Sequence, residues 1–294
     1  MASITTIRSG NLEARVSSLG AELQGLALEG TEYLWQGDER WWPRRSPVLF
    51  PTVGCLPNDE ATSAAGPVHL KRHGLARIYE HEVVEAGEDH VRYQLESSPE
   101  TLAAFPFDFR LNMTYALADG RLEQRFEVTN TGERDLPFQL GGHPAFSVPV
   151  AGTDEAYEDY ELRFAEPWDA VSPGIGGAGL YDWDTMLTVF EGTDVLPVTH
   201  ELFEKYLTVT LMDVPGRTIT LAGTKSGHGL QVDFPGFDYL GLWSAEGRAP
   251  FVAIEPWCGC ASAATGSRTF EDKRGLQVIA PGETFMRSFF VRPF

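Results

Sequence analysis

The feature that most constrains the fold is a series of short segments in which apolar and polar residues alternate between tight-turn residues. The segment FRLNMTYALADGRLEQRFEVTN, residues 109–130, alternates on both sides of Asp119-Gly120, a pattern that predicts a β-hairpin. The same pattern occurs around Gly87 and around Pro215-Gly216. Short strands are also predicted at GLQVDF, YLGLWS, FVAIEPW, GLQVIA and TFMRSFFVRPF.

Helical signals are almost absent from the chain. One short helix is predicted in SSPETLAAF, with Ser98 as N-cap, Pro99 at the first helical position and Phe105-Pro106 at its end. Many short strands with so little helix predict an all-β sandwich or barrel. The Gly-rich residues 170–184 are expected to form a long loop inside the domain. No change of composition marks a linker, so we expect residues 1–294 to form a single domain.

Charge and cysteine content limit the classes of partner. A formal net charge of -19 argues against nucleic acids and anionic membranes as partners. No apolar run approaches the ~20 residues of a membrane span, and the N-terminus lacks the apolar core of a signal peptide. Cys258 and Cys260 are too close together for an easy disulfide or a usual zinc pair, and no His/Cys cluster accompanies them or Cys55. We therefore expect a cytoplasmic protein without a metal site.

The carboxylate of Glu255 stands next to apolar residues that would perturb it. It follows four apolar residues in FVAIEPWCG and precedes Pro256-Trp257, so it is expected at the end of a buried strand. A carboxylate in that position must be hydrogen-bonded or must have a raised pKa. A structural carboxylate and a functional one would both fit this pattern.

Two histidines have comparable surroundings. His73, in KRHGLAR, precedes Gly74, which lets the backbone approach another segment closely. His143, in DLPFQLGGHPAFSVPV, lies between Gly141-Gly142 and a proline, where the backbone is expected to be irregular and such positions are often functional. A turn histidine and a core histidine would give the same two patterns. His228, between glycines in SGHGL, is expected at a hairpin or loop tip.

Five segments occur in a specific order: RRSPVLFPTVG, HGLAR, FPFDFRLNMTYAL, GGHPAF and FVAIEPWCG. Together they resemble the aldose 1-epimerase (galactose mutarotase) family, and most closely its LacX-like branch. HGLAR and GGHPAF are also similar to segments of the hexose-6-phosphate mutarotases. The resemblance implies a β-supersandwich, in which large antiparallel sheets pack face to face and a concave surface carries a sugar-binding groove.

The resemblance also implies a chemistry and its residues. Mutarotation opens the hemiacetal ring of a free sugar and closes it on the other face, which requires one base and one acid but no metal or redox cofactor. Glu255 matches the family's general base, and His143 matches the general acid at the ring oxygen. His73 matches a second histidine that hydrogen-bonds the sugar and polarises the reacting centre. An imidazole suits the acid role because its unperturbed pKa is about 6.5.

Substrate contacts are expected from Arg77, Arg45 and Trp257. Arginine forks bind hydroxyls, carboxylates or phosphates, and a tryptophan can stack on the apolar face of a sugar. Surface ion pairs and core packing are the alternative interpretations. Trp35, Trp41 and Trp42 are weaker candidates for the same groove.

The chain departs from the family pattern at two places. Cys55 stands where LacX-like proteins commonly have an arginine, and Glu204-Lys205 stand near the position of a sugar-binding aspartate. Both departures affect the grip on substrate more than the proton-transfer pair. They leave the identity of the sugar open.

Three other functions compete with a cofactor-free aldose 1-epimerase. A sugar-phosphate mutarotase is suggested by the basic residues Arg44, Arg45, Lys71, Arg72 and Arg77. A non-catalytic carbohydrate-binding protein could use the same scaffold, but it would not need an acid/base pair. A polysaccharide lyase or hydrolase is disfavoured because no helical second domain is predicted.

Overall fold

Antiparallel strand pairing organises the structure, a computed structural model that describes residues 2–294. The largest sheet has nine strands in the order β16-β15-β18-β19-β23-β11-β10-β9-β8. Its strands are β8 (Glu82–Ala86), β9 (His90–Glu96), β10 (Phe109–Ala118), β11 (Arg121–Asn130), β15 (Tyr160–Ile175), β16 (Tyr181–Pro197), β18 (Thr218–Gly223), β19 (Gly229–Asp233) and β23 (Thr284–Pro293).

A second sheet has six strands and lies near the centre of the molecule. Its order is β17-β20-β21-β13-β5, and β14 also pairs with β21. The strands are β5 (Val48–Leu49), β13 (Leu140–Gly142), β14 (Ala145–Ser147), β17 (Thr208–Met212), β20 (Tyr239–Trp243) and β21 (Phe251–Cys258). All eight residues of β21 are buried, so any polar side chain on this strand is removed from bulk water.

Three smaller sheets complete the strand content. A four-stranded N-terminal sheet contains β1 (Ile4–Ser9), β2 (Leu12–Ser17), β3 (Leu23–Leu28) and β4 (Thr31–Glu32). Two-stranded sheets are formed by β6 (Glu60–Ser63) with β7 (Gly66–His69), and by β12 (Leu136–Phe138) with β22 (Gln277–Ile279). The prediction of an all-β fold is therefore confirmed.

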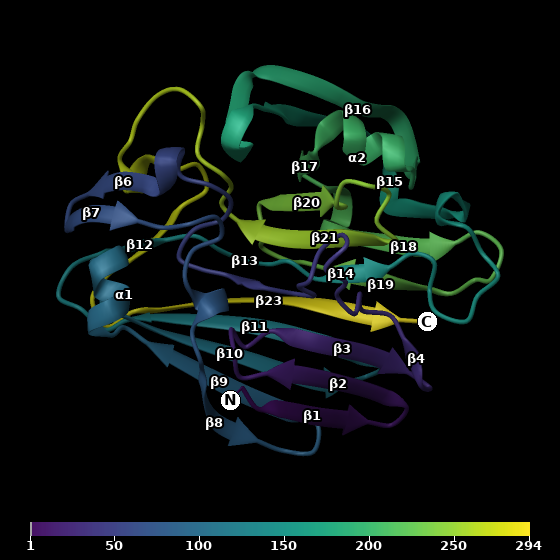
Figure 1. Ribbon diagram of the computed structural model, residues 1–294, viewed down its shortest axis with the longest axis horizontal. Helices are drawn as coiled ribbons and strands as arrows, with labels where there is room; N and C mark the ends of the chain where they lie inside the picture. The colour runs from purple at the N-terminus through teal and green to yellow at the C-terminus, as the bar shows by residue number, and fades with distance from the viewer. Residues whose placement is uncertain (1) are drawn as a thin grey trace.

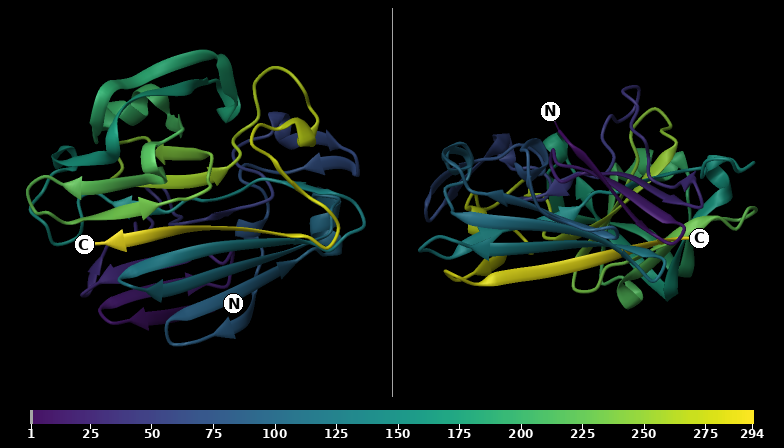
Figure 2. Two further views of the ribbon diagram at one scale, coloured as in Figure 1. Left: turned by 180° about the vertical axis from the view of Figure 1, so that it is seen from behind. Right: turned by 90° about the horizontal axis from the view of Figure 1, so that it is seen from below.

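The sheets lie in layers. The N-terminal strands β1 and β2 contact β9 and β10 of the nine-stranded sheet, and Figure 1 shows them at the opposite end of the molecule from the β15–β16 hairpin. The six-stranded sheet lies between the hairpin and β23 in Figure 1, and the view from behind in Figure 2 agrees. β11 illustrates why the layers pack: its residues alternate strictly between buried and partly exposed, as expected for a strand with one face on a core.

Helices are few and short in the described residues. α1 (Pro99–Ala104) has Ser98 as N-cap and is followed by Phe105, so its predicted limits are confirmed. α2 (His200–Tyr206), capped by Thr199, was not predicted, because seven residues are too few to show helical periodicity. The 3₁₀ turns are η1 (Pro57–Asp59), η2 (Ala76–Ile78), η3 (Tyr157–Asp159), η4 (Gly177–Gly179), η5 (Pro215–Arg217) and η6 (Phe270–Asp272). None of the helices in residues 2–294 is long and apolar enough to cross a membrane.

Two of the three predicted hairpins are confirmed, and the third is wrong. β10 pairs with β11 across Asp119-Gly120, and β8 pairs with β9 across Gly87. The strands flanking Pro215-Gly216 both exist, but β17 belongs to the six-stranded sheet and β18 to the nine-stranded one. This turn therefore passes the chain from one sheet to the other. His228 does lie in the turn between β18 and β19, as predicted.

The expectation of a long loop at residues 170–184 is also wrong. Those residues form the end of β15, the η4 turn and the first four residues of β16. β15 pairs with β18 only through residues 160–164, so the rest of the hairpin is a two-stranded arm with several register shifts. Pro167 and Pro173 are accommodated there, because an arm with a free edge and bulges does not require every backbone N–H for pairing.

Candidate active site

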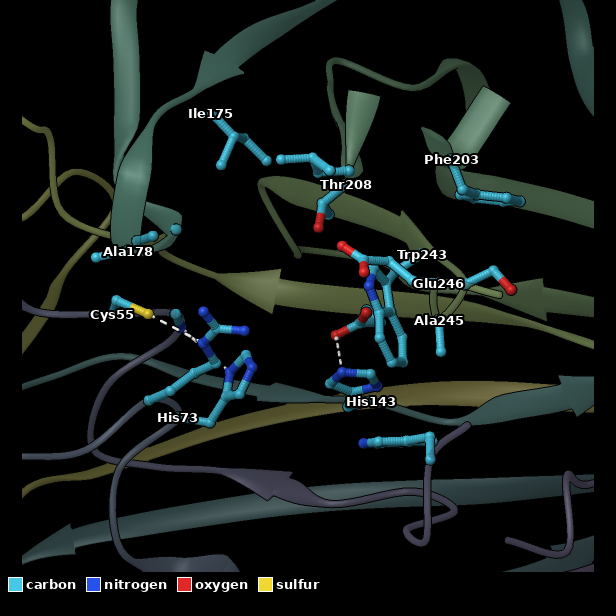
Figure 3. A pocket seen from close by; sticks show the side chains of 18 of the residues that line it. Cys55, His73, His143, Ile175, Ala178, Phe203, Thr208, Trp243, Ala245 and Glu246 are labelled. Carbon is cyan, nitrogen blue, oxygen red and sulfur yellow. Dashed lines mark hydrogen bonds and ion pairs between the residues drawn. The ribbon is translucent and has the colours of Figure 1, made fainter. Parts of the chain in front are cut away.

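A cavity of about 990 Å³ opens between the six-stranded sheet, the tip of the β15–β16 arm, and α2. Its volume lies at the upper end of the range of about 300–1,000 Å³ that is usual for small-molecule sites. Figure 3 shows that Cys55 and His73 lie on one side of it, and Phe203, Ala245 and Glu246 on the other. Ile175 and Ala178, from the tip of the arm, form a further part of the wall.

Glu255 projects into this cavity from the buried strand β21. It pairs with Gly241 of β20 and lies inside the strand rather than at its end, with 2 % of its surface exposed. Burial raises the pKa of its carboxyl well above the usual range. The neighbouring indole of Trp257 acts in the opposite direction. The carboxyl oxygen Oε2 accepts no hydrogen bond within residues 2–294, and the imidazole of His143 is its polar neighbour at 3.3 Å.

Strand register brings His143 to Glu255. β13 pairs with Trp257 and Cys258 of β21, and β14 pairs with Phe251, Val252 and Ala253 of the same strand. The interruption between β13 and β14, where His143 lies, therefore falls opposite Glu255. The Nε2 atom of His143 is 3.3 Å from the Oε2 atom of Glu255, as the dashed line in Figure 3 marks.

The two glycines before His143 are required by close packing. A Cβ atom on Gly141 would lie 2.6 Å from the ring of Trp257, and one on Gly142 would lie 2.6 Å from the ring of Phe289. Real Cβ contacts are not that short, so only glycine lets this segment pack between the two aromatic rings. The Gly-Gly-His-Pro stretch is thus an irregular, tightly packed link that fixes the position of one imidazole.

His143 is held by aromatic side chains. The Trp42 ring stacks on it with centroids 4.8 Å apart and an interplanar angle of 25°, and Trp243 contacts it edge-on. The residue is 7 % exposed. Burial lowers its pKa to about 3, and the charges of Arg77 and Arg72 act in the same direction. Burial therefore favours the uncharged forms of both His143 and Glu255.

His73 completes the group from the other side. Its backbone φ is +68°, and its ring centroid lies 5.5 Å from that of His143. The backbone N–H of Gly54 donates to Nδ1 at 3.2 Å, so the neutral ring carries its proton on Nε2. The close approach predicted at Gly74 is also present, because a Cβ there would lie 2.3 Å from the carbonyl oxygen of Phe50.

The expected substrate contacts divide into two sets. Arg77 and Trp257 line the cavity together with Glu255, His143 and His73. Arg45 does not line it: its guanidinium donates to Oε1 of Gln24 at 2.6 Å. The structure therefore places five of the six expected residues around one cavity and leaves Arg45 outside.

Of the three weaker tryptophan candidates, two line the cavity and one does not. Trp41 and Trp42 line the cavity, whereas Trp35 packs behind it against Phe251. Trp257 is fixed by another glycine, because a Cβ on Gly241 would lie 2.3 Å from its ring.

Both positions that depart from the family pattern lie near this cavity. The Sγ atom of Cys55 accepts a hydrogen bond from Nε of Arg72 at 3.0 Å. Glu204 lines the cavity from α2, whereas Lys205 points to the Tyr206 hydroxyl instead. The described residues contain no group of three or more His, Cys, Asp or Glu side chains arranged to hold a metal ion.

Sequence reasoning missed several lining residues. Tyr181 donates to or accepts from Oγ1 of Thr210, and it lies in the segment expected to be a loop. His200 and Phe203 come from the unpredicted helix α2. Trp243 follows four buried residues of β20 and had no distinguishing signal, since an aromatic residue at a strand end is usually core.

Comparison with known proteins defines the class to which this fold and site belong. The family profile described as Aldose 1-epimerase matches residues 3–283. The chain therefore belongs to the aldose 1-epimerase family.

Individual relatives agree with this assignment. Protein LacX (plasmid) of Lactococcus lactis subsp. lactis is 33% identical over 291 residues, which cover 96% of this chain and 97% of LacX. A galactose mutarotase related enzyme from Lactobacillus acidophilus superposes with a TM-score of 0.93 at 28% identity, covering 99% of this chain and 97% of that one. A galactose mutarotase-like protein from Lactobacillus casei gives a TM-score of 0.90 at 31% identity, covering 99% and 100%. The predicted galactose mutarotase-like fold is thereby confirmed.

Proposed function

We propose that this protein interconverts the α and β anomers of an aldose, with Glu255 as general base and His143 as general acid. The observation that carries the proposal is the 3.3 Å separation of Glu255 Oε2 and His143 Nε2 within one sugar-sized cavity. The two oxygen atoms that exchange protons in mutarotation, the anomeric hydroxyl and the ring oxygen, are both bonded to C1. A base and an acid that serve them must therefore lie side by side.

The reaction can be followed proton by proton. The Glu255 carboxylate removes the proton of the anomeric hydroxyl, the C1–ring oxygen bond breaks, and C1 becomes an aldehyde. His143 donates its Nε2 proton to the departing ring oxygen. After rotation about the C1–C2 bond the same steps run in reverse, and the ring closes on the other face. Both side chains then regain their starting state, so no other reactant is consumed.

Because Glu255 and His143 are buried together, the pair can hold one proton that moves between the carboxyl and the imidazole. A protonated Glu255 with a neutral His143 has the same total charge as a carboxylate with an imidazolium, so a single proton moved between them produces the active form. Burial opposes either charge alone, whereas charges in direct contact stabilise each other. Sugar hydroxyls that enter the cavity add hydrogen bonds to the charged form. His73, whose ring centroid lies 5.5 Å from that of His143, can use its Nε2–H to polarise the oxygen that accumulates charge.

The test is exchange spectroscopy by NMR, which measures the rate at which the two anomers of a sugar interconvert. We expect Glu255→Gln to lower the protein-catalysed rate by about 10²- to 10⁴-fold. Sugar binding, measured by calorimetry, should change little, because glutamine retains the shape of the side chain. Exchange at the full rate in Glu255→Gln would remove Glu255 as the base.

A non-catalytic sugar-binding role makes a different prediction. It requires sugar binding without any acceleration of anomer exchange. The approach of a buried carboxyl to a buried imidazole disfavours that role, since burial of both groups is costly and a binding protein gains nothing from it.

A further inference from the structure

Two guanidinium groups on the His73 side of the cavity lack an acidic partner. Arg72 and Arg77 both line the cavity, and no carboxylate within residues 2–294 forms an ion pair with either of them. Nε of Arg77 is buried and has no hydrogen-bond partner. Nε of Arg72 is used by Cys55, and this leaves its two terminal nitrogens available.

The carboxylate that acts electrostatically on Arg77, that of Glu22, already has other hydrogen-bond and ion-pair partners. Glu22 influences Arg77 electrostatically, but its Oε2 pairs with Arg44 at 3.2 Å. Its Oε1 accepts from the backbone N–H groups of Arg45 and Ser46. Arg77 therefore faces the cavity with a charge that the protein itself does not neutralise.

The surroundings of His73 are electropositive as a whole. Burial lowers the pKa of His73 most, and the imidazole of His143 together with the charges of Arg77, Arg72 and Lys273 lowers it further, with no carboxylate to offset them. Lys273 is buried behind the wall, where its Nζ donates to the Cys260 carbonyl and the Ser262 hydroxyl. In a chain with a net charge of -19, such a concentration of positive charge in a cavity indicates an anionic ligand.

The acidic lining residues lie elsewhere. Glu246 is on the opposite side of the cavity from Cys55 and His73 in Figure 3, and Glu204 comes from α2. Arg248 also lines the cavity, but it pairs with Glu158 and Glu201. The cavity is thus polarised, with the guanidinium groups of Arg72 and Arg77, unpaired in the described residues, at one end, and the Glu255–His143 pair between them and the carboxylates at the other.

Resting on the proposed function, we propose that the aldose carries an anionic group on C6, a phosphate or a carboxylate, which is bound by Arg72 and Arg77. C6 is attached to the carbon next to the ring oxygen. His143 is the group assigned to that oxygen, and His73 lies beside His143 with ring centroids 5.5 Å apart. In the orientation that we propose, with C1 at Glu255 and the ring oxygen at His143, the C6 substituent extends toward His73 and the two arginines. Guanidinium forks bind phosphate and carboxylate oxygens in pairs.

Arg72 is held in place for this role. Its Nε–Sγ contact with Cys55 fixes one edge of the guanidinium. The tip of the β15–β16 arm packs against it, since a Cβ on Gly179 would lie 2.9 Å from one terminal nitrogen of Arg72. A guanidinium fixed on two sides loses less side-chain entropy when it binds an anion.

The experiment measures anomer exchange with matched neutral and anionic sugars. The panel contains glucose and galactose, their 6-phosphates, and glucuronate and galacturonate. We expect kcat/KM for at least one anionic sugar to exceed that of its neutral counterpart by about tenfold or more. Preference for the 6-phosphates identifies a phosphate ligand, and preference for the uronates identifies a carboxylate ligand.

Variants locate the effect. Arg72→Gln is expected to lower kcat/KM for the preferred anionic sugar by about tenfold or more and to change the neutral sugars by less than about threefold. Arg77→Gln should likewise lower kcat/KM for the preferred anionic sugar by about tenfold or more. Arg134→Gln, which removes the same charge from an exposed residue outside the cavity, should leave the preference unchanged. Arg72 is largely exposed, so its replacement is not expected to affect folding, and circular dichroism checks this for each variant.

Two negative outcomes have different meanings. Equal kcat/KM for neutral and anionic sugars would overturn the anion subsite and leave the proposed mutarotation intact. If no sugar is exchanged but calorimetry shows 6-phosphate or uronate binding that Arg72→Gln weakens, the proposed function fails and the subsite stands. Absence of any anionic-sugar binding in the wild-type chain would overturn the subsite directly.

Discussion

The Oε2 atom of Glu255 lies 3.3 Å from the Nε2 atom of His143, and both side chains are almost completely buried. The contact follows from sheet register, because the gap between β13 and β14 falls opposite the middle of β21. Neither residue is placed by a loop that could move independently. A base and an acid fixed by paired strands keep their separation through each catalytic cycle.

Replacement of Trp42 by alanine should disturb His143 without touching Glu255. The stacked indole covers one face of the imidazole, so its removal admits water and should raise the pKa of His143 from about 3 toward 6.5. We expect kcat for anomer exchange to fall about tenfold or more, because the donor is no longer held in one orientation. The pKa can be followed from the NMR shift of the His143 ring protons.

Trp41→Ala is the matched control for that variant. Trp41 also lines the cavity, but its ring contacts Trp35 and Arg40 and its Nε1 donates to the Gly247 carbonyl, and it does not stack on His143. Its removal should leave the pKa of His143 unchanged. The same pKa change in both variants would show that general opening of the cavity, and not the Trp42 stack, controls His143.

Gly241→Ala should displace Trp257. The new methyl group would lie 2.3 Å from the indole ring, so the ring must leave its position over β20. If Trp257 stacks on the sugar, binding should weaken about three- to tenfold in a calorimetric titration. Gly177→Ala adds the same methyl group to another lining residue with no atom within 4 Å and should bind as the wild type does. Unaltered affinity in Gly241→Ala would argue against a stacking role for Trp257.

Gly74→Ala should destabilise the fold and misplace His73. Its φ is +73°, and a Cβ would lie 2.3 Å from the Phe50 carbonyl oxygen. We expect the free energy of unfolding to fall by at least about 2 kcal/mol, measured by urea denaturation. Gly120→Ala separates the two causes, because it has a φ of +71° but no atom within 4 Å. Equal losses in the two variants would mean that the contact with Phe50 contributes nothing.

Stability should decrease on mild acidification because of buried imidazoles. Burial lowers the pKa of His81 from 6.5 to about 4, so between those values the unfolded chain binds a proton that the folded chain does not. The free energy of unfolding should fall as the pH drops through this window, by up to about 3 kcal/mol from His81 alone. His73 and His143 act in the same direction.

Two variants test the sign of this effect by urea denaturation at pH 7 and pH 5. His81→Gln should reduce the loss between the two values, since it retains a donor for the Ala76 carbonyl but does not titrate. His90→Gln should increase it. Asp89 and Glu85 raise the pKa of His90, so protonated His90 stabilises the folded state at low pH and that contribution disappears as the pH rises. An unchanged pH dependence in His81→Gln would refute the assignment.

Sequence signals predicted the secondary structure correctly where neighbouring residues alone determine the backbone conformation. The Asp119-Gly120 turn and the Ser98 cap each fix the backbone within a few residues, so the sequence predicted β10, β11 and α1 correctly. The segments around His73, His143 and Glu255 could likewise be selected as candidates from the local sequence, because glycines and prolines lie beside their titratable side chains.

Features that depend on tertiary contacts could not be predicted. A Pro215-Gly216 turn has the same local sequence whether the strands beside it pair or enter separate sheets. The proline-containing arm looks like a loop until one knows that only its base joins the large sheet. Arg45 follows another arginine, Arg44, so the local sequence does not show which side chain faces the cavity. Only the folded chain shows that the guanidinium of Arg45 hydrogen-bonds Gln24 instead of lining the cavity.

The attachment of the β15–β16 arm has a consequence for how such a protein can diversify. Its tip borders the cavity, yet the arm carries none of the strand pairing that positions Glu255 and His143. Insertions, deletions or exchanges in the arm would reshape what the site admits while the reactive pair stays where β13, β14 and β21 put it. Selectivity and reactivity can therefore evolve, or be engineered, on separate pieces of the chain.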